Sequence, residues 1–263
     1  MLLTYTEAKS GAPAPALLRR RSSHFWVNSV SKAISSTSLC NSVSPLRNSV
    51  AKNLLTLHNF QKSYGDHPIL TIPDWQLPPG IHWLKGPNGA GKTTLFRSIA
   101  GMLPHEGSVM LNNLDSRRDV VAYRLKVNYA EAEPTFPPFL TAHELIKWVA
   151  DAKQAPTGQA ESLIDAFRVG TYQHTPVGTY SSGMLKKMSL IMAFLGQPML
   201  ILLDEPLVTL DVAATQTVAQ LIDEAHQRGV SFLLSSHQAM ETAQLPIDSI
   251  WQVANQTVMP VAI

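Results

Sequence analysis

Apolar and polar positions alternate along residues 54–60, which read LLTLHNF, and this two-residue period predicts a half-buried strand. Short apolar runs predict further strands at 68–77, 81–84, 108–112, 127–130, 199–203 and 230–234. Helical periods are found at about 92–100, 141–167, 183–195 and 212–228, and a hairpin-like end follows around 250–258. Because strands alternate with helices, we expect an α/β fold with a mostly parallel sheet. The helical stretch 141–195 interrupts this alternation and is expected to form a subdomain.

The beginning of the chain has a different composition. Residues 1–50 contain eleven serines and show no sustained helical or strand period. Residues 1–52 carry seven basic residues against Glu7 as the one acid. Three interpretations fit: a disordered basic tail, a targeting segment, or upstream sequence translated from a misplaced start. We favour the last two over any folded role, and expect the folded domain to span 53–263.

Charge and cysteine content limit the classes of protein that fit. The net charge is +2, and beyond residue 52 fourteen basic residues stand against 18 acidic ones. That balance does not suit wrapping around a polyanion, so no nucleic-acid partner is expected. Cys40 is the single cysteine, which prevents an intrachain disulfide and fits a reducing compartment. The most apolar run, 190–203, is broken by a Gly-Gln-Pro step, so no membrane-spanning helix is predicted.

A glycine-rich turn between a predicted strand and a predicted helix carries the first chemical signal. Residues 86–94 read GPNGAGKTT and match G-x-x-x-x-G-K-[ST] in the required strand–turn–helix context. Its glycines let backbone N–H groups point inward around phosphates. Lys92 adds charge beside the β- and γ-phosphates, and Thr93 offers a hydroxyl to Mg²⁺. The predicted nucleotide-binding residues are Gly86, Pro87, Asn88, Gly89, Ala90, Gly91, Lys92, Thr93 and Thr94.

Two acids follow a second strand. Residues 199–206 read MLILLDEP, an apolar strand that ends at Asp204 and Glu205. Doubly wound sheets place their chemistry at the carboxyl ends of strands. We therefore expect Asp204 to meet Mg²⁺, directly or through water, and Glu205 to orient or deprotonate an attacking water.

A second candidate anion site lies at 179–187, where the sequence reads TYSSGMLKK at the start of an apolar helix. The first N–H groups of a helix are unpaired and its dipole is positive there, which favours anions. One chain then has two anion sites on separate subdomains. A two-fold dimer is the simplest way to use both on one ligand.

These three motifs, in this order, resemble those of the ATP-binding cassette (ABC) transporter ATPases. GPNGAGKTT resembles their Walker A motif, YSSGM their signature motif, and ILLDEP their Walker B motif with its following glutamate. The resemblance covers about 53–258. It implies a P-loop NTPase core with a mostly parallel sheet, an N-terminal antiparallel β part and a helical signature subdomain at about 134–195.

The family resemblance also assigns roles to single residues. It implies that two cassettes stack head to tail, so that Ser181, Ser182 and Gly183 hold the γ-phosphate of the partner's ATP. Tyr64 stands where the family has an aromatic side chain that stacks on adenine, and His237 matches its switch histidine at the γ-phosphate. The predicted catalytic residues are Glu205, His237 and Lys92. Asp211 matches a loop that contacts the partner subunit, and it could equally cap a helix.

One position departs from the family pattern. Where the family usually has a glutamine after the strand at 127–130, the alignment places Ala132, which cannot bind Mg²⁺. We hypothesise that Glu131 or Glu133 takes over, or that the metal is held by Thr93, Asp204, water and phosphate. Ser182, often a glycine in the family, is a milder departure.

The resemblance implies an ATP-hydrolysing subunit, with ATP and Mg²⁺, that powers a separate integral membrane permease. The motifs are most similar to those of small single-cassette bacterial exporters. The expected partners are that permease, docking near residues 131–148, and a second cassette, identical or closely homologous. The expected place is the cytoplasmic face of the inner or plasma membrane, reached through the permease. The alternatives are a soluble non-transport ABC ATPase of DNA repair or ribosome work, and a catalytically inactive binding module. The single Walker A motif disfavours the first, and intact Lys92, Asp204, Glu205 and His237 disfavour the second.

Overall fold

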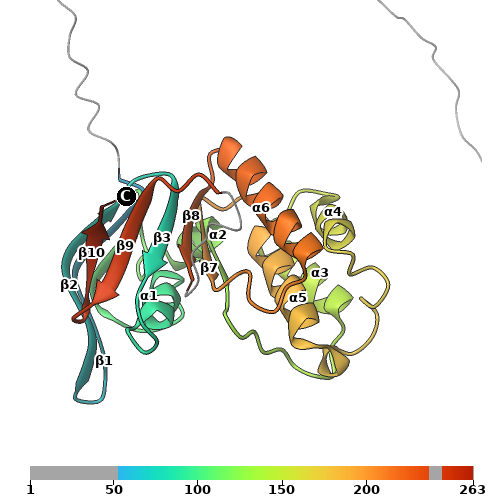
Figure 1. The fold of residues 1–263 in the computed structure, drawn as a ribbon, viewed down its shortest axis with the longest axis horizontal. Helices are drawn as coiled ribbons and strands as arrows, with labels where there is room; N and C mark the ends of the chain where they lie inside the picture. Colours follow the sequence, from blue (N-terminus) through green and yellow to red (C-terminus); the bar gives the residue numbers. More distant parts are fainter. Residues whose placement is uncertain (1–52, 237–244, 263) are drawn as a thin grey trace, which may run out of the picture. The chain divides into compact units, whose positions relative to one another are not determined.

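The computed structural model describes residues 53–236 and 245–262, all within one compact unit, Asn48–Ile263. Its strands form two sheets (Figure 1). The first is antiparallel, in the order β2-β1-β4-β5. Its strands are β1 (Leu55–Tyr64), β2 (His67–Leu77), β4 (Glu106–Leu111) and β5 (Leu114–Asp115). Buried residues alternate with exposed ones along much of β1 and β2, because one face of this sheet packs on the core.

The second sheet has six strands in the order β10-β9-β3-β8-β7-β6. It consists of β3 (Ile81–Lys85), β6 (Val127–Ala130), β7 (Leu200–Asp204), β8 (Ser231–Ser235), β9 (Ser249–Ala254) and β10 (Thr257–Val261). All neighbouring strands are parallel except β9 and β10. The expected mostly parallel core and N-terminal antiparallel part are therefore confirmed.

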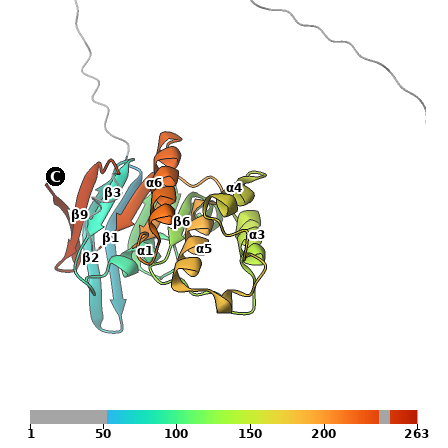
Figure 2. The same ribbon diagram turned by 45° about the vertical axis from the view of Figure 1, so that its right-hand side comes forward.

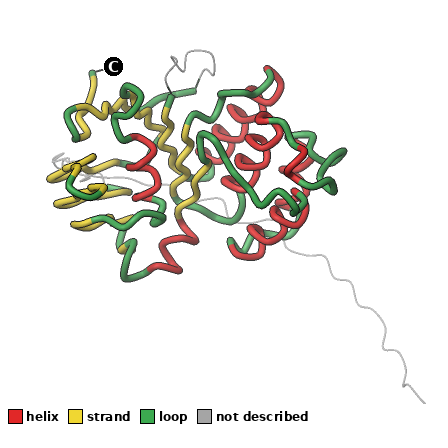
Figure 3. Tube along the Cα trace, turned by 90° about the horizontal axis from the view of Figure 1, so that it is seen from below, coloured by secondary structure: helices red, strands yellow, loops and turns green. Residues whose placement is uncertain are grey.

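Helices flank the parallel sheet. They are α1 (Lys92–Ile99), α2 (Val120–Lys126), α3 (Ala142–Ala152), α4 (Gln159–Ala166), α5 (Ser182–Phe194) and α6 (Val212–Gln227), with a 3-10 turn at Val177–Thr179. In Figures 1 and 2, α3, α4 and α5 gather at the end away from the antiparallel sheet. Figure 3, seen from below, shows a group of helices at the end of the domain away from most of the strands. None of the helices in the described ranges is long and apolar enough to cross a membrane.

Two hydrophobic cores meet at the parallel sheet. Along β7, Leu200 and Leu202 face a core shared with the antiparallel sheet and α1, whereas Ile201 and Leu203 face a core shared with α3 to α6. Every residue of β7 is buried. A strand covered on both faces reads as a continuous apolar run, which explains why this strand was predictable.

Two expectations about the helices need refinement. The helical period at 141–167 is carried by two helices rather than one continuous element, since the chain breaks between α3 and α4. Gln154 and Gly158 have φ values of 52° and 82° there, which no helix tolerates. The short helix α2 was not predicted, because it buries one side chain, Tyr123, and therefore shows no apolar stripe.

Candidate nucleotide site

The glycine-rich turn joins β3 to α1 and lines a cavity of about 240 Å³, which we call the phosphate cavity because the turn is predicted to surround phosphates. The cavity is lined by Ile69, residues 88–94 and Glu205. Gly91 precedes α1 with φ 102°, and a Cβ at this position would lie 3.2 Å from carbons of Ile69 and Leu70. Only glycine fits this conformation and this space, so the backbone can turn its N–H groups toward the cavity.

Lys92 begins α1 with its side chain folded back over the turn. Its Nζ donates hydrogen bonds to the carbonyl oxygens of Gly86, at 2.7 Å, and Pro87, at 3.1 Å. Burial lowers the pKa of Lys92, while the nearby Glu205 and Asp204 carboxylates act in the opposite direction. The ammonium thus lies within the loop that was predicted to surround the phosphates.

Thr93 of α1 and Asp204 of β7 come together although 111 positions separate them in the sequence. The Thr93 hydroxyl donates a 2.6 Å hydrogen bond to Asp204 Oδ2, and the Ser235 hydroxyl donates to Asp204 Oδ1. The Tyr129 hydroxyl donates a 3.4 Å hydrogen bond to Asp204 Oδ2. A hydroxyl and a carboxylate in contact form the hard oxygen donor set that Mg²⁺ prefers, so these residues fit a magnesium ion.

Glu205 is the first residue after β7. Its φ of 47° is left-handed, a conformation that costs free energy for a residue with a side chain. The Glu205 N–H lies 3.2 Å from both the carbonyl oxygen and the hydroxyl of Ser235, so the end of β8 supports the strained backbone. The side chain lines the phosphate cavity, where a carboxylate can act on water.

The residues of the signature stretch stand at the start of α5. Ser181 is its N-cap, and its hydroxyl accepts a 3.3 Å hydrogen bond from the Met184 N–H. Ser181 and Ser182 are exposed, and the described lining of the phosphate cavity lies on other elements. A Cβ on Gly183 would come within 2.8 Å of the Thr209 carbonyl oxygen, so this glycine allows the loop after β7 to pass close to α5.

Three further predicted residues have different outcomes. Tyr64 ends β1 with half of its surface exposed, and Lys62 Nζ lies 4.8 Å from its ring centroid. Asp211 caps α6, accepting a 2.7 Å hydrogen bond from the Ala214 N–H. The expected N-cap role of Asp211 is therefore observed. His237 lies outside the described residues, as does Cys40.

Asp211 also connects the two motif-bearing segments. Lys187 of α5 donates a 2.8 Å hydrogen bond to its carboxylate. This hydrogen bond is the main cause that lowers the pKa of Asp211, and the Ala214 N–H adds to it.

Neither candidate for the missing glutamine lines the phosphate cavity as described. Glu131 Oε1 lies 3.5 Å from an Arg97 guanidinium nitrogen of α1, and Glu133 is exposed. Whether Glu131 or Glu133 serves the metal stays a prediction.

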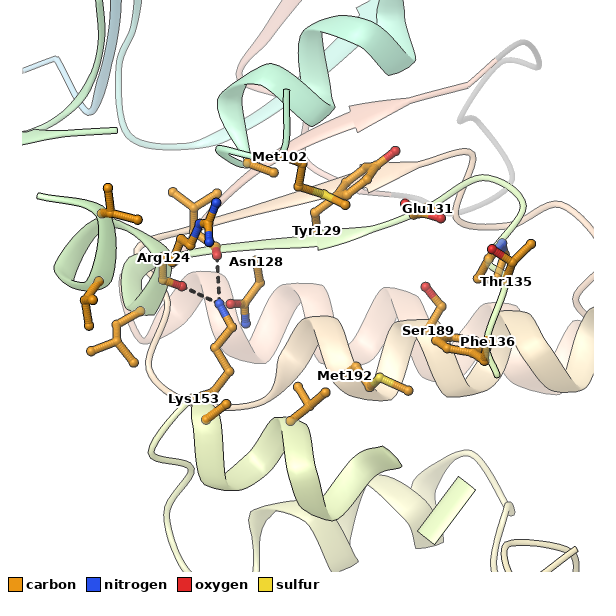
Figure 4. A pocket seen from close by; sticks show the side chains of 18 residues that line it. Met102, Arg124, Asn128, Tyr129, Glu131, Thr135, Phe136, Lys153, Ser189 and Met192 are labelled. Atoms are coloured by element: carbon orange, nitrogen blue, oxygen red, sulfur yellow. Dashed lines mark hydrogen bonds between the residues drawn. The ribbon is translucent and has the colours of Figure 1, made fainter. Parts of the chain in front are cut away.

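A larger groove of about 690 Å³ lies between the parallel core and the helical subdomain (Figure 4). Its apolar lining includes Met102, Val121, Phe136 and Met192. Its polar lining includes Asn128 and Lys153 (Figure 4). The sequence analysis did not identify this groove, because its lining comes from several short segments far apart in the chain.

Asn128 and Lys153 both use their side-chain nitrogens on backbone carbonyl oxygens. Asn128 is 3% exposed, and its amide nitrogen donates to the carbonyl oxygens of Ala193 and Leu195. Its carbonyl oxygen Oδ1 has no hydrogen-bond partner in the described part of the chain. Lys153 Nζ donates to the carbonyl oxygens of Arg124 and Val127, and burial lowers the pKa of Lys153 to about 8.

Comparison with known proteins agrees with this geometry. Residues 72–208 match the model of a family described as ABC transporter. The cytochrome c biogenesis ATP-binding export protein CcmA of Legionella pneumophila is 34% identical over 181 residues, covering 66% of this chain and 88% of that protein. The ABC-type transporter ATP-binding protein EcsA of Bacillus subtilis is 32% identical over 203 residues, covering 75% and 82%. A solved structure of the ATP-binding subunit of an ABC transporter superposes with a TM-score of 0.72 at 26% identity, covering 80% of this chain and 90% of that one.

Proposed function

The chain belongs to the ABC transporter family, as an ATP-binding subunit whose ATP hydrolysis is coupled to transport, and we propose how its residues divide that work. The observation that carries the proposal is that Lys92, Thr93 and Glu205 line one cavity, while Asp204 accepts a hydrogen bond from Thr93. These residues come from two segments more than a hundred positions apart. The fold brings them together only because β3 and β7 both flank β8 in the same parallel sheet.

In the proposed reaction the turn at 86–91 binds the phosphates through its backbone N–H groups, and the helix dipole of α1 adds to their attraction. Lys92 exchanges its two carbonyl partners for β- and γ-phosphate oxygens, which places its charge where negative charge develops. Thr93 and Asp204 would hold Mg²⁺, which would supply positive charge against the negative charge of the phosphates. Glu205 then orients the attacking water and accepts its proton. Tyr64 offers an exposed ring face to the adenine base.

We propose that the signature residues act on the ATP of a second subunit. Ser181 and Ser182 are exposed at a helix start, while the chain's own phosphate cavity is lined by other elements. A two-fold arrangement would bring each signature to the partner's γ-phosphate. Asp211 lies near the start of α5, because its carboxylate accepts a hydrogen bond from Lys187 of that helix.

The groove of about 690 Å³ supports the proposal that the subunit binds a membrane partner. Exposed apolar side chains at its rim, such as Met102 and Val121, favour burial against another protein. We propose that an integral membrane permease inserts a segment here and holds this subunit at the membrane. The names of the relatives favour transport over a soluble DNA-repair or ribosomal role, and CcmA is named as an export protein.

The test is steady-state ATP hydrolysis by the full chain with Mg²⁺. We expect Lys92→Ala to lower kcat/KM for ATP by about a hundredfold or more, because the phosphate charge loses its nearest cation. Lys147→Met is the matched control, since Lys147 is an exposed lysine of α3 that pairs with Asp151. The proposal is wrong if wild-type protein does not bind ATP, or if Lys92→Ala behaves like the control.

A further inference from the structure

Lys186 is a buried lysine that none of the sequence motifs explains. It lies in α5 one helical turn after Ser182, and it is 1% exposed. Its Nζ donates to three backbone carbonyl oxygens: Glu131 at 2.8 Å, Ala132 at 3.1 Å and Asp204 at 2.9 Å. An ammonium has three N–H donors, so these three carbonyls use all of them.

The three carbonyls lie where two neighbouring strands separate. β6 and β7 pair in parallel, and their described register ends at Ala130 opposite Leu203. Glu131 and Asp204 are the next residues on each side. Lys186 therefore bridges the two chains at the point where their backbone ladder stops. It fixes the spacing between the ends of β6 and β7 in place of ladder hydrogen bonds.

The residues whose carbonyl oxygens bind Lys186 lie next to the residues assigned to ATP hydrolysis. The Asp204 side chain accepts the Thr93 hydroxyl, and Glu205 follows it directly along the chain. On the other side, Glu131 and Ala132 belong to the segment that lacks the family's glutamine. The Lys186 ammonium thus holds the backbone from which both the metal-binding carboxylate and the water-activating carboxylate project.

Packing alone does not explain a lysine at this place. Met188, Leu190 and Ile191 of the same helix are fully buried apolar side chains, and an apolar residue at position 186 would likewise be buried without desolvating a charge. What a lysine adds is a cationic donor to three carbonyls from two separate segments, which no apolar side chain provides.

We propose that Lys186 is a positioning residue for ATP hydrolysis, which fastens the signature helix α5 to the ends of β6 and β7 and thereby holds Asp204 and Glu205 in place. This inference rests on the proposed function. Since Ser181 caps the same helix, a movement of α5 on binding the partner's ATP is transmitted through Lys186 to the subunit's own carboxylates. One side chain then links the two phosphate sites of a subunit.

The test compares Lys186→Met, Lys186→Gln and the control Lys147→Met in the full chain, measuring kcat, ATP affinity and the Mg²⁺ requirement. Methionine keeps the length but donates nothing, whereas glutamine keeps two N–H donors. We expect Lys186→Met to lower kcat by about tenfold or more and to raise the Mg²⁺ concentration for half-maximal rate, with ATP affinity changed less than about threefold. Lys186→Gln should recover part of both losses. A purely structural lysine would not produce this separation of kcat and Mg²⁺ requirement from ATP affinity.

Two results would overturn the inference. One is an unchanged kcat and Mg²⁺ requirement in Lys186→Met. The other is a loss of ATP affinity as large as the loss of kcat, which would mean general damage to the fold. If Lys186→Met does not fold, Lys186→Gln decides alone: it must show a reduced kcat and a raised Mg²⁺ requirement. Glu205→Gln in the same assay distinguishes failure of this inference from failure of the proposed function. Full ATP hydrolysis by Glu205→Gln would refute the proposed function, whatever the Lys186 variants show.

Discussion

The Thr93 hydroxyl and the Asp204 carboxylate lie 2.6 Å apart, although 111 positions separate them in the sequence. Thr93 is the second residue of α1 and Asp204 the last of β7. The contact joins the phosphate-binding turn to the acidic strand end. The hydroxyl and the carboxylate are also the oxygen donors that would hold Mg²⁺.

Replacing Thr93 by valine should raise the Mg²⁺ concentration needed for half-maximal ATP hydrolysis by about tenfold or more. Valine has nearly the shape of threonine but cannot offer an oxygen to the ion. Thr93→Ser keeps the hydroxyl and is the control, with a Mg²⁺ requirement close to that of the wild type. Equal Mg²⁺ titrations for the two variants would show that Thr93 is not a ligand.

Gly183→Ala should lower the free energy of unfolding by about 1–3 kcal/mol, as overpacking commonly does. The new methyl group would lie 2.8 Å from the Thr209 carbonyl oxygen, and a backbone oxygen cannot rotate away. Ser182→Ala is the control, because Ser182 is exposed one position earlier in α5. Urea unfolding followed by circular dichroism gives the comparison. Equal stability of Gly183→Ala and Ser182→Ala would mean that the loop after β7 is not held against α5.

His82 makes stability depend on pH. Its ring is fully buried between Ser249 and the Pro78 carbonyl oxygen, and burial lowers its pKa from the ordinary value near 6.5. Below that value the unfolded chain takes up a proton that the folded chain does not. Stability is therefore complete above pH 6.5 and falls as the pH drops toward the lowered pKa. The fall is limited to about 1.4 kcal/mol per pH unit for one proton.

We expect His82→Gln to have a flatter profile of unfolding free energy between about pH 7 and pH 5, even if its stability is lower throughout. The exposed His67 provides the control, and His67→Gln should keep the wild-type slope. His105, whose pKa burial also lowers, contributes a remaining slope of the same sign. An unchanged slope in His82→Gln would show that His82 does not stay neutral in the folded state.

Phe136→Asp should move the subunit out of the membrane fraction of the cells that make it. A carboxylate in the apolar lining of the groove opposes burial against a docking segment of a permease. Met259→Asp is the control, since Met259 is a 40% exposed apolar residue of β10 that lies outside the described groove lining and outside residues 131–148. Release of Met259→Asp but not of Phe136→Asp would place the docking surface elsewhere.

The sequence predicted those parts of the fold whose residues face one environment along their length. β6 was predicted at its observed bounds, because its short apolar run is followed by acids. The position of α2 could not be predicted, since Tyr123 alone of its residues is buried. The same limit applies to the site. Motif spacing indicated Lys92, Thr93, Asp204 and Glu205, because the chemistry fixes those residue types.

The supporting residues could not be read in this way. The Ser235 hydroxyl donates to Asp204 because β8 lies beside β7, and the sequence does not show which strands are neighbours. Lys186 donates to backbone carbonyl oxygens, which every residue has, so its partners leave no pattern in the sequence. Asn128 reaches the groove only because β6 packs against α5. A charged residue among the apolar positions of α5 was the one visible signal for Lys186. It does not say what the charge contacts.

The most direct test of the central claim is light scattering of the full chain carrying Glu205→Gln, with and without Mg²⁺ and ATP. Without the proton acceptor, ATP should remain unhydrolysed between two subunits. We predict an ATP-dependent change from monomer to dimer, which Ser181→Arg abolishes because the arginine side chain blocks the start of α5. A Glu205→Gln chain that binds ATP and stays monomeric at every protein concentration, or a dimer that Ser181→Arg leaves intact, would contradict the claim that the signature acts on the partner's nucleotide.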